Sequence, residues 1–177
     1  MREYFDGELD EAAAFLGVGV GTAFIAGSFI PRGYFGVGLA AAVLPVSAVE
    51  VVAGLVLLGR TSSQVAELSS VLIRDPSRYR DEELARMQGV NFWFDVYMGI
   101  EIGLIAVGAA SVVFGAVDDR SGFVGAGLGL AAQAGAMLTF DLVAAARADE
   151  YTARIEEFSM SVRPVVSPAL LGVAGNF

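Results

Sequence analysis

Residues 91–117 read NFWFDVYMGIEIGLIAVGAASVVFGAV, and this stretch decides the fold class. It exceeds the roughly 20 residues that an α-helix needs to cross about 30 Å of hydrocarbon. Apolar residues occur on all sides of it, without the polar stripe of a helix in a soluble bundle or the alternation of a membrane β-strand. The stretch therefore predicts a membrane-spanning helix and disfavours the rival interpretation, a compact soluble bundle.

Three further segments have the same character, namely residues 12–30, 34–59 and 122–146. The whole chain of 177 residues is 55% hydrophobic and 18% charged, with a mean hydropathy of +0.64. A soluble domain carries about 25% charged residues. We therefore expect one all-α, polytopic membrane domain with four transmembrane helices.

The arginines predict the orientation of these helices. The chain has 11 basic residues, all of them arginine, and nine lie before the first span, within residues 60–90 or after residue 146. The positive-inside rule then places both termini in the cytoplasm. The segment before residue 12 is acidic, which argues against a cleavable signal peptide. Arginine as the only basic residue, with many Ala, Gly and Val, favours the inner membrane of a high-GC bacterium.

Two segments are expected outside the bilayer. Residues 60–90 form a cytoplasmic loop that divides at Asp75-Pro76, because the residue before a proline is pushed out of helical geometry. The first half of this loop has apolar residues on one face and predicts a short interfacial helix. The second half, residues 80–88, mixes both charge signs and is expected to extend the third helix into the cytoplasm. In the tail, residues 147–177, charged residues are followed by an apolar end, which either docks onto a partner or the bundle or lacks order.

A weak internal repeat links the two halves of the chain. Residues 36–41 match residues 127–132, and the same shift carries Glu50 onto Asp141. This match predicts two tandem helical hairpins related by an axis along the membrane normal. Both matched segments fit a dinucleotide-binding glycine pattern, but that pattern needs a preceding strand. Small residues four apart instead predict close helix packing at Gly17, Gly21, Gly125 and Gly129.

The residue types that are missing exclude several kinds of chemistry. The chain contains no Cys, His or Lys, so we expect no histidine-ligated haem or zinc and no Schiff base with retinal or pyridoxal phosphate. No nucleophile with a paired base is visible, so an enzyme is the least supported class. The net charge of −9 argues against nucleic acid as a partner. The expected partners are the lipid bilayer and either further copies of the chain or other membrane subunits.

Four acids lie within the predicted spans, namely Glu50, Asp95, Glu101 and Asp141, and no basic residue lies there. Glu50 and Glu101 are about 14–16 Å from the cytoplasmic ends of their helices, whereas the aspartates are shallower. An ionised acid at the membrane centre costs at least about 2.5–3.5 kcal/mol. We therefore expect the four acids to face the interior of the bundle, and the two glutamates to be neutral or to share one proton.

Three neutral polar residues are predicted to support these acids, namely Ser47, Tyr97 and Gln133. Such a cluster can relay protons or bind a hard cation such as Na⁺, Ca²⁺ or Mn²⁺ through oxygen atoms. The alternative is that protonated acids only join helices by hydrogen bonds, with the aspartates reaching the interface. Trp93 and Tyr97 are expected to anchor the chain at the membrane interface.

Two functions remain open at this point. In the preferred one, the protein is a small transport or channel-type unit, an oligomer, whose carboxyl groups handle protons or a cation. In the other, it is a non-catalytic accessory or assembly subunit that packs against other membrane proteins. Only the first explains why four acids lie in lipid.

Overall fold

Four long helices make up almost the whole molecule. A computed structural model describes residues 2–161, 163–167 and 170–174, with side chains described for residues 3–158. The described chain is helical apart from a two-stranded antiparallel hairpin near the C-terminus. Its elements are α1 (Arg2–Phe29), the 3₁₀ helix η1 (Ile30–Arg32), α2 (Tyr34–Arg74), α3 (Pro76–Val117), α4 (Ser121–Ser161), β1 (Arg163–Ser167) and β2 (Leu170–Ala174).

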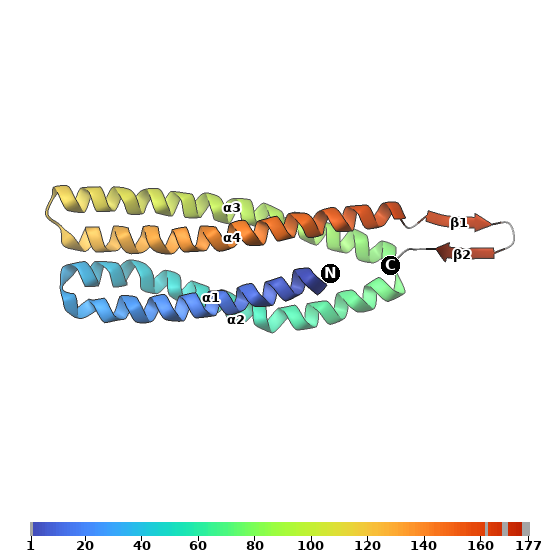
Figure 1. Ribbon diagram of the computed structural model, residues 1–177, viewed down its shortest axis with the longest axis horizontal. Helices are drawn as coiled ribbons and strands as arrows, with labels where there is room; N and C mark the ends of the chain where they lie inside the picture. The colour runs from blue at the N-terminus through green and yellow to red at the C-terminus, as the bar shows by residue number, and fades with distance from the viewer. Residues whose placement is uncertain (1, 162, 168–169, 175–177) are drawn as a thin grey trace.

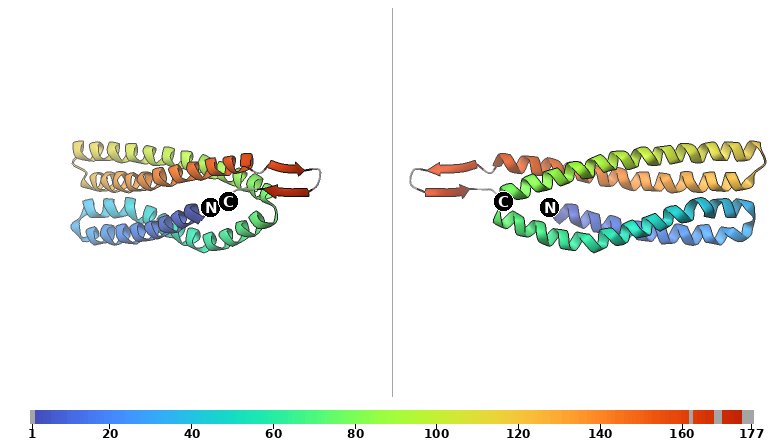
Figure 2. Two further views of the ribbon diagram at one scale, coloured as in Figure 1. Left: turned by 45° about the vertical axis from the view of Figure 1, so that its right-hand side comes forward. Right: turned by 180° about the vertical axis from the view of Figure 1, so that it is seen from behind.

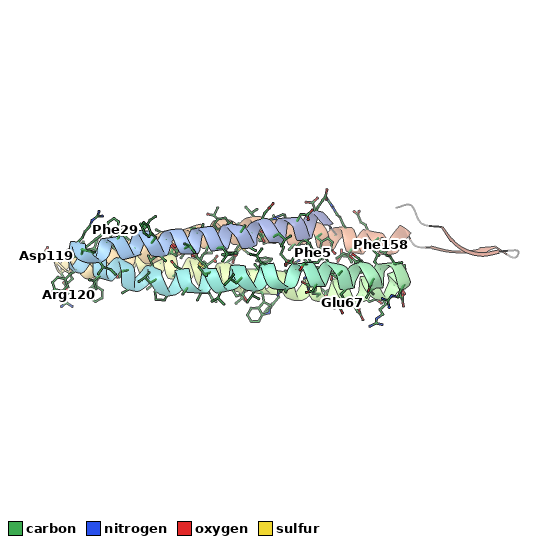
Figure 3. The ribbon with its side chains drawn as sticks, turned by 90° about the horizontal axis from the view of Figure 1, so that it is seen from below. Phe5, Phe29, Glu67, Asp119, Arg120 and Phe158 are labelled. Carbon is green, nitrogen blue, oxygen red and sulfur yellow. The ribbon has the colours of Figure 1, made fainter. Side chains whose placement is uncertain are left out.

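The helices form two hairpins whose turns lie at the same end of the molecule (Figures 1 and 2). We call this end, residues 30–33 and 118–120, the double-turn end, and the opposite end, where α1 begins and α2 ends, the terminal end. Figure 3 shows Phe29 and Asp119 together at the double-turn end. The first turn needs Gly33, whose φ is 85°, and the second holds Asp119 at a φ of 51°. Positive φ is easy for glycine and tolerated by aspartate. The two hairpins match the predicted arrangement, while their origin as a repeat stays a prediction.

Helices α2 and α4 join the two hairpins through glycines. A Cβ atom added at Gly125 would run into the backbone carbonyl of Phe35, and one added at Gly38 would run into that of Gly122. At Gly129 an added Cβ would lie 2.9 Å from the Val43 side chain. Close backbone approach of this kind is how helices pack in lipid, where no hydrophobic force drives them together. In contrast, α1 contacts α4 and α2 contacts α3 only sparsely.

The other two glycines predicted at helix contacts do not lie at one. A Cβ atom added at Gly17 or Gly21 would meet open space. The contact between α1 and α2 instead uses Gly19, where an added Cβ would lie 2.9 Å from the carbonyl oxygen of Ser47. The predicted contact face of this helix was therefore wrong by two residues.

All four helices are long and apolar enough to cross a membrane. Their outer faces are apolar near the double-turn end, where Phe24 is 79% exposed and Val52 and Val107 are each 59% exposed. Large exposed apolar surface is costly in water and favourable in lipid. The molecule is therefore compatible with a small integral membrane protein.

The helices are much longer than a bilayer requires. Helix α2 has 41 residues and α3 has 42, which is about 60 Å of helix against about 30 Å of hydrocarbon. Residues 60–90, expected as a loop with a separate interfacial helix, are helical except for Asp75, and the expected extension of the third helix over residues 80–88 is part of α3. The expected interfacial helix is thus the last part of α2, without a break. The tail expected from residue 147 begins as the last part of α4, and the apolar side chains at the end of this tail lie outside the described residues.

The break at Asp75-Pro76 is where the sequence predicts it. Proline occupies the first position of α3, where its missing N–H costs nothing. The Asp75 carboxylate accepts hydrogen bonds from the Ser77 hydroxyl (2.7 Å) and the Arg78 backbone N–H (3.0 Å). These bonds hold the pKa of the Asp75 carboxyl below its usual range. Helices α2 and α3 are therefore joined by one capped residue.

A buried polar cluster holds the terminal end together, and we call it the tyrosine cluster (Tyr4, Tyr79, Glu83, Arg86 and Tyr151). The Tyr151 hydroxyl donates to Glu83 (2.9 Å) and lies 2.8 Å from the Tyr79 hydroxyl. Arg86 donates to both oxygens of Glu83, at 2.7 and 2.8 Å. The Tyr4 ring stacks on Tyr151 with centroids 4.6 Å apart. The cluster fixes the start of α1 against α3 and α4.

Candidate functional site

A cavity of about 720 Å³ opens between α2 and α3, which make few contacts with each other. Its lining includes residues of all four helices, and along α3 it runs from Arg86 to Leu104, a length of about 27 Å. Four large hydrophobic lining residues from α2 and α3 are more than half exposed, namely Val49, Val56, Trp93 and Ile100. The cavity therefore starts near the tyrosine cluster and is also open along one side of the bundle.

The deep part of this cavity holds a pair of carboxyl groups, Glu101 on α3 and Asp141 on α4. Glu101 is 2% exposed and Asp141 is 7% exposed, and the two carboxyl groups interact electrostatically. Neither Glu101 oxygen accepts a hydrogen bond from an amide, hydroxyl or guanidinium group of the described residues. Burying a carboxylate without a partner is costly. A negative charge on this pair therefore needs a proton or a cation to balance it.

Glu50 enters the cavity from α2 and belongs to a separate polar network. It is 1% exposed, and its carboxylate accepts a 2.6 Å hydrogen bond from the Gln133 amide. The same amide lies 3.3 Å from the Thr22 hydroxyl, which is 2.8 Å from the Ser47 hydroxyl. Gln133 thus supports Glu50 directly, as expected from the sequence. Ser47 acts only through Thr22, a residue that the sequence analysis did not select.

Asp95 does not join the other three acids. It is exposed and does not line the cavity, because α3 turns it away from α2 and α4. Tyr97 lines the cavity but is 47% exposed, and its ring stacks on Trp93 with centroids 5.7 Å apart. No hydrogen bond from Tyr97 to Glu101 is found among the described side chains. The expected cluster of four acids is therefore a pair with a third carboxyl group in the same cavity.

The cavity mouth carries ion pairs that the sequence analysis missed. Three arginines line it, and each is bound to a glutamate among the described residues: Arg60 to Glu8 at 3.5 Å, Arg86 to Glu83 at 2.7 Å, and Arg147 to Glu11. The charges just outside the apolar segments were visible in the sequence, but their pairing depends on how the helices pack. With each arginine paired at the mouth, Glu50, Glu101 and Asp141 have no guanidinium partner among the described residues.

This arrangement suits some ligands better than others. Among the described residues no group of three or more Asp, Glu, His or Cys side chains is placed to hold a metal ion. Divalent hard cations such as Ca²⁺ take six to eight oxygen ligands. Two facing carboxyl groups fit a shared proton or a singly charged cation better.

No protein-family model, characterised protein or solved structure matches the chain. Its function is therefore argued from the cavity and the carboxyl groups within it.

Proposed function

We propose that this chain crosses a membrane four times, with both termini and the terminal end of the bundle in the cytoplasm, and takes up protons or a cation at its buried carboxyl groups. The orientation is supported by the arginines, nine of which lie outside the two turns of the double-turn end. The proposed location is a bacterial inner membrane, and the active form is an oligomer.

One observation carries the proposal. Glu101 lies beside Asp141 in a cavity of about 720 Å³, and both Glu101 oxygens are buried without a donor. A carboxyl group in this position needs a positive charge, either as a bound proton or as a bound cation. Glu101 differs in this respect from Glu50, whose carboxylate accepts a hydrogen bond from Gln133.

The depth of the carboxyl groups supports access from one side only. Glu50 and Glu101 each lie 16 residues from the double-turn end of their helix, or about 24 Å. Between them and that end, backbones approach closely at glycines such as Gly38, Gly108 and Gly125. The cavity extends from these carboxyl groups toward the terminal end, which we propose is the cytoplasmic side. Passage across the membrane would then require the glycine-packed half to loosen.

A second candidate function is that of an accessory subunit. The side opening between α2 and α3 favours it, because an apolar helix of another membrane protein would fill that opening. In this role the carboxyl groups would anchor the partner and would carry nothing.

The test is a flux measurement on purified protein in liposomes. Glu50 and Glu101 are replaced together by glutamine, and the matched control is Asp95→Asn, which removes an acid of α3 that faces away from the cavity. A membrane potential drives uptake, and trapped dyes report protons and Na⁺. We expect flux in the wild type and in the control, and at least a tenfold loss in the double variant.

Size-exclusion chromatography shows whether the double variant assembles like the wild type. Equal flux in all three proteins, or none in the wild type, would overturn the transport proposal. Flux that only the double variant loses, with unchanged assembly, would overturn the accessory role.

A further inference from the structure

We propose that the cavity binds an organic cation with an apolar body, such as a quaternary ammonium or phosphonium compound. This inference rests on the proposed function for the position of the site and adds the class of substrate. It is carried by four independent features of the cavity, namely its charge, its walls, its size and its side opening.

The charge of the deep cavity selects a cation. Glu101 and Asp141 both line this cavity without a guanidinium partner, and both Glu101 oxygens lack a donor, among the described residues. The arginines of the lining are paired with Glu8, Glu11 and Glu83 at the mouth. An anion would therefore meet unpaired carboxyl groups, whereas a cation would supply the missing charge.

The walls of the cavity select an organic cation over a hydrated metal ion. Aromatic rings line it from the mouth to the deep carboxyl groups, namely Tyr4, Phe15, Trp93, Phe94 and Tyr97. The faces of such rings attract ammonium-type cations, most strongly where water is excluded. Trp93 and Tyr97 stack on each other, and Tyr97 lies one helical turn before Glu101, so the two rings form a wall that leads to the carboxyl pair. Anchoring at the interface, expected for both, is compatible with this role.

The size and the side opening of the cavity fit an apolar body. Its volume of about 720 Å³ lies within the roughly 300–1,000 Å³ of sites for drug-sized ligands. A bare metal ion would leave most of it empty. The opening between α2 and α3 is bordered by exposed apolar side chains, including Val49 and Ile100. In a bilayer this opening faces lipid, so a ligand that partitions into the membrane reaches the carboxyl pair sideways.

The single tryptophan of the chain makes the inference directly testable. Trp93 lines the cavity, so its fluorescence in vesicles that contain only lipid and this protein reports the site without a label. The probe is tetraphenylphosphonium, and tetraphenylborate is the control, because the two ions share a shape and carry opposite charges. We expect a saturable change in Trp93 emission with tetraphenylphosphonium and none with tetraphenylborate.

Variants connect the signal to the carboxyl pair. Replacing Glu101 by glutamine together with Asp141→Asn is expected to weaken binding at least tenfold, while Asp95→Asn leaves it unchanged. Tyr97→Leu is expected to weaken it about threefold or more, since a cation over an aromatic ring contributes about 0.5–2 kcal/mol. Tyr97 is half exposed, so this variant keeps the test valid if the double variant does not fold.

Several outcomes would overturn the inference: equal responses to both ions, binding that the double variant and Tyr97→Leu retain in full, or no saturable response. The inference and the proposed function fail separately. Proton flux that depends on the carboxyl groups, without tetraphenylphosphonium binding, removes the inference and leaves the function. Binding that depends on Glu101, without flux in any protein, supports the inference and removes the function.

Discussion

Replacing Tyr151 by phenylalanine removes one hydroxyl group from the tyrosine cluster and leaves the ring in place. That hydroxyl donates to Glu83 at 2.9 Å and lies 2.8 Å from the Tyr79 hydroxyl. Glu83 is 0% exposed and Tyr79 is 5% exposed, so water cannot replace the lost partner. The stacking of the ring on Tyr4 remains, and the change therefore isolates the hydrogen bonds from the packing.

The expected loss of stability follows from these two contacts. A hydrogen bond to a charged group contributes about 1.5–3 kcal/mol, and leaving a buried hydroxyl with one partner fewer adds about 1 kcal/mol. We therefore expect Tyr151→Phe to destabilise the terminal end by about 2.5–4 kcal/mol. The effect is local, because the cluster lies beyond the apolar segments.

Hydrogen exchange in detergent measures this effect residue by residue. Amides at the start of α1 and the end of α4 should exchange about tenfold faster for each 1.4 kcal/mol lost. The matched control is Tyr34→Phe, which removes a hydroxyl from a side chain that is 84% exposed and is expected to change stability by less than about 0.5 kcal/mol. If both variants exchange like the wild type at the terminal end, the buried network does not hold that end together.

Two further predictions concern helix packing and helix capping. Gly125→Leu should separate α2 from α4, because the new side chain meets the Phe35 backbone, and should lower stability by about 1–3 kcal/mol or more. Gly135→Leu places the same side chain in open space on the same helix and should leave stability unchanged. Thermal unfolding in detergent compares the two variants. Asp75→Ala should speed amide exchange in the first turn of α3, with Asp75→Asn closer to the wild type. Because the pKa of Asp75 is lowered, the stabilisation of the helix end by its carboxylate is complete at neutral pH and is lost on acidification below about pH 4. Amide exchange in the first turn of α3 that does not depend on pH would contradict a capping role.

Much of the fold follows from hydropathy alone, but the helix ends do not. The four apolar segments and the break at Asp75-Pro76 could be predicted, since length in lipid and proline geometry are local properties. The drop in hydropathy near residue 60 suggested a loop, yet α2 continues to Arg74. Outside lipid, a helix persists where side chains such as Tyr79 and Met87 are buried against other helices, and such tertiary contacts leave only a weak trace in the local sequence.

The candidate site was predictable in its residues and less so in its pairing. Glu101 lies 17 residues before Asp118, and Asp141 lies 21 residues after Arg120. Counting from the turn therefore brings these two acids within about one helical turn of each other. The contact of Glu50 with Gln133 joins two different hairpins, and no local count gives their relative register. The direction of Asp95 likewise depends on the rotation of α3 about its axis.

The unequal ends of the molecule have a practical consequence for reconstitution. The double-turn end has only two tight turns with few charges, whereas the terminal end carries about 30 Å of additional, heavily charged helix. When the protein enters preformed vesicles, only the short end can be threaded through the lipid at modest cost. We therefore expect nearly all copies to have the same orientation, with the cavity mouth outside the vesicle and the double-turn end facing the vesicle lumen.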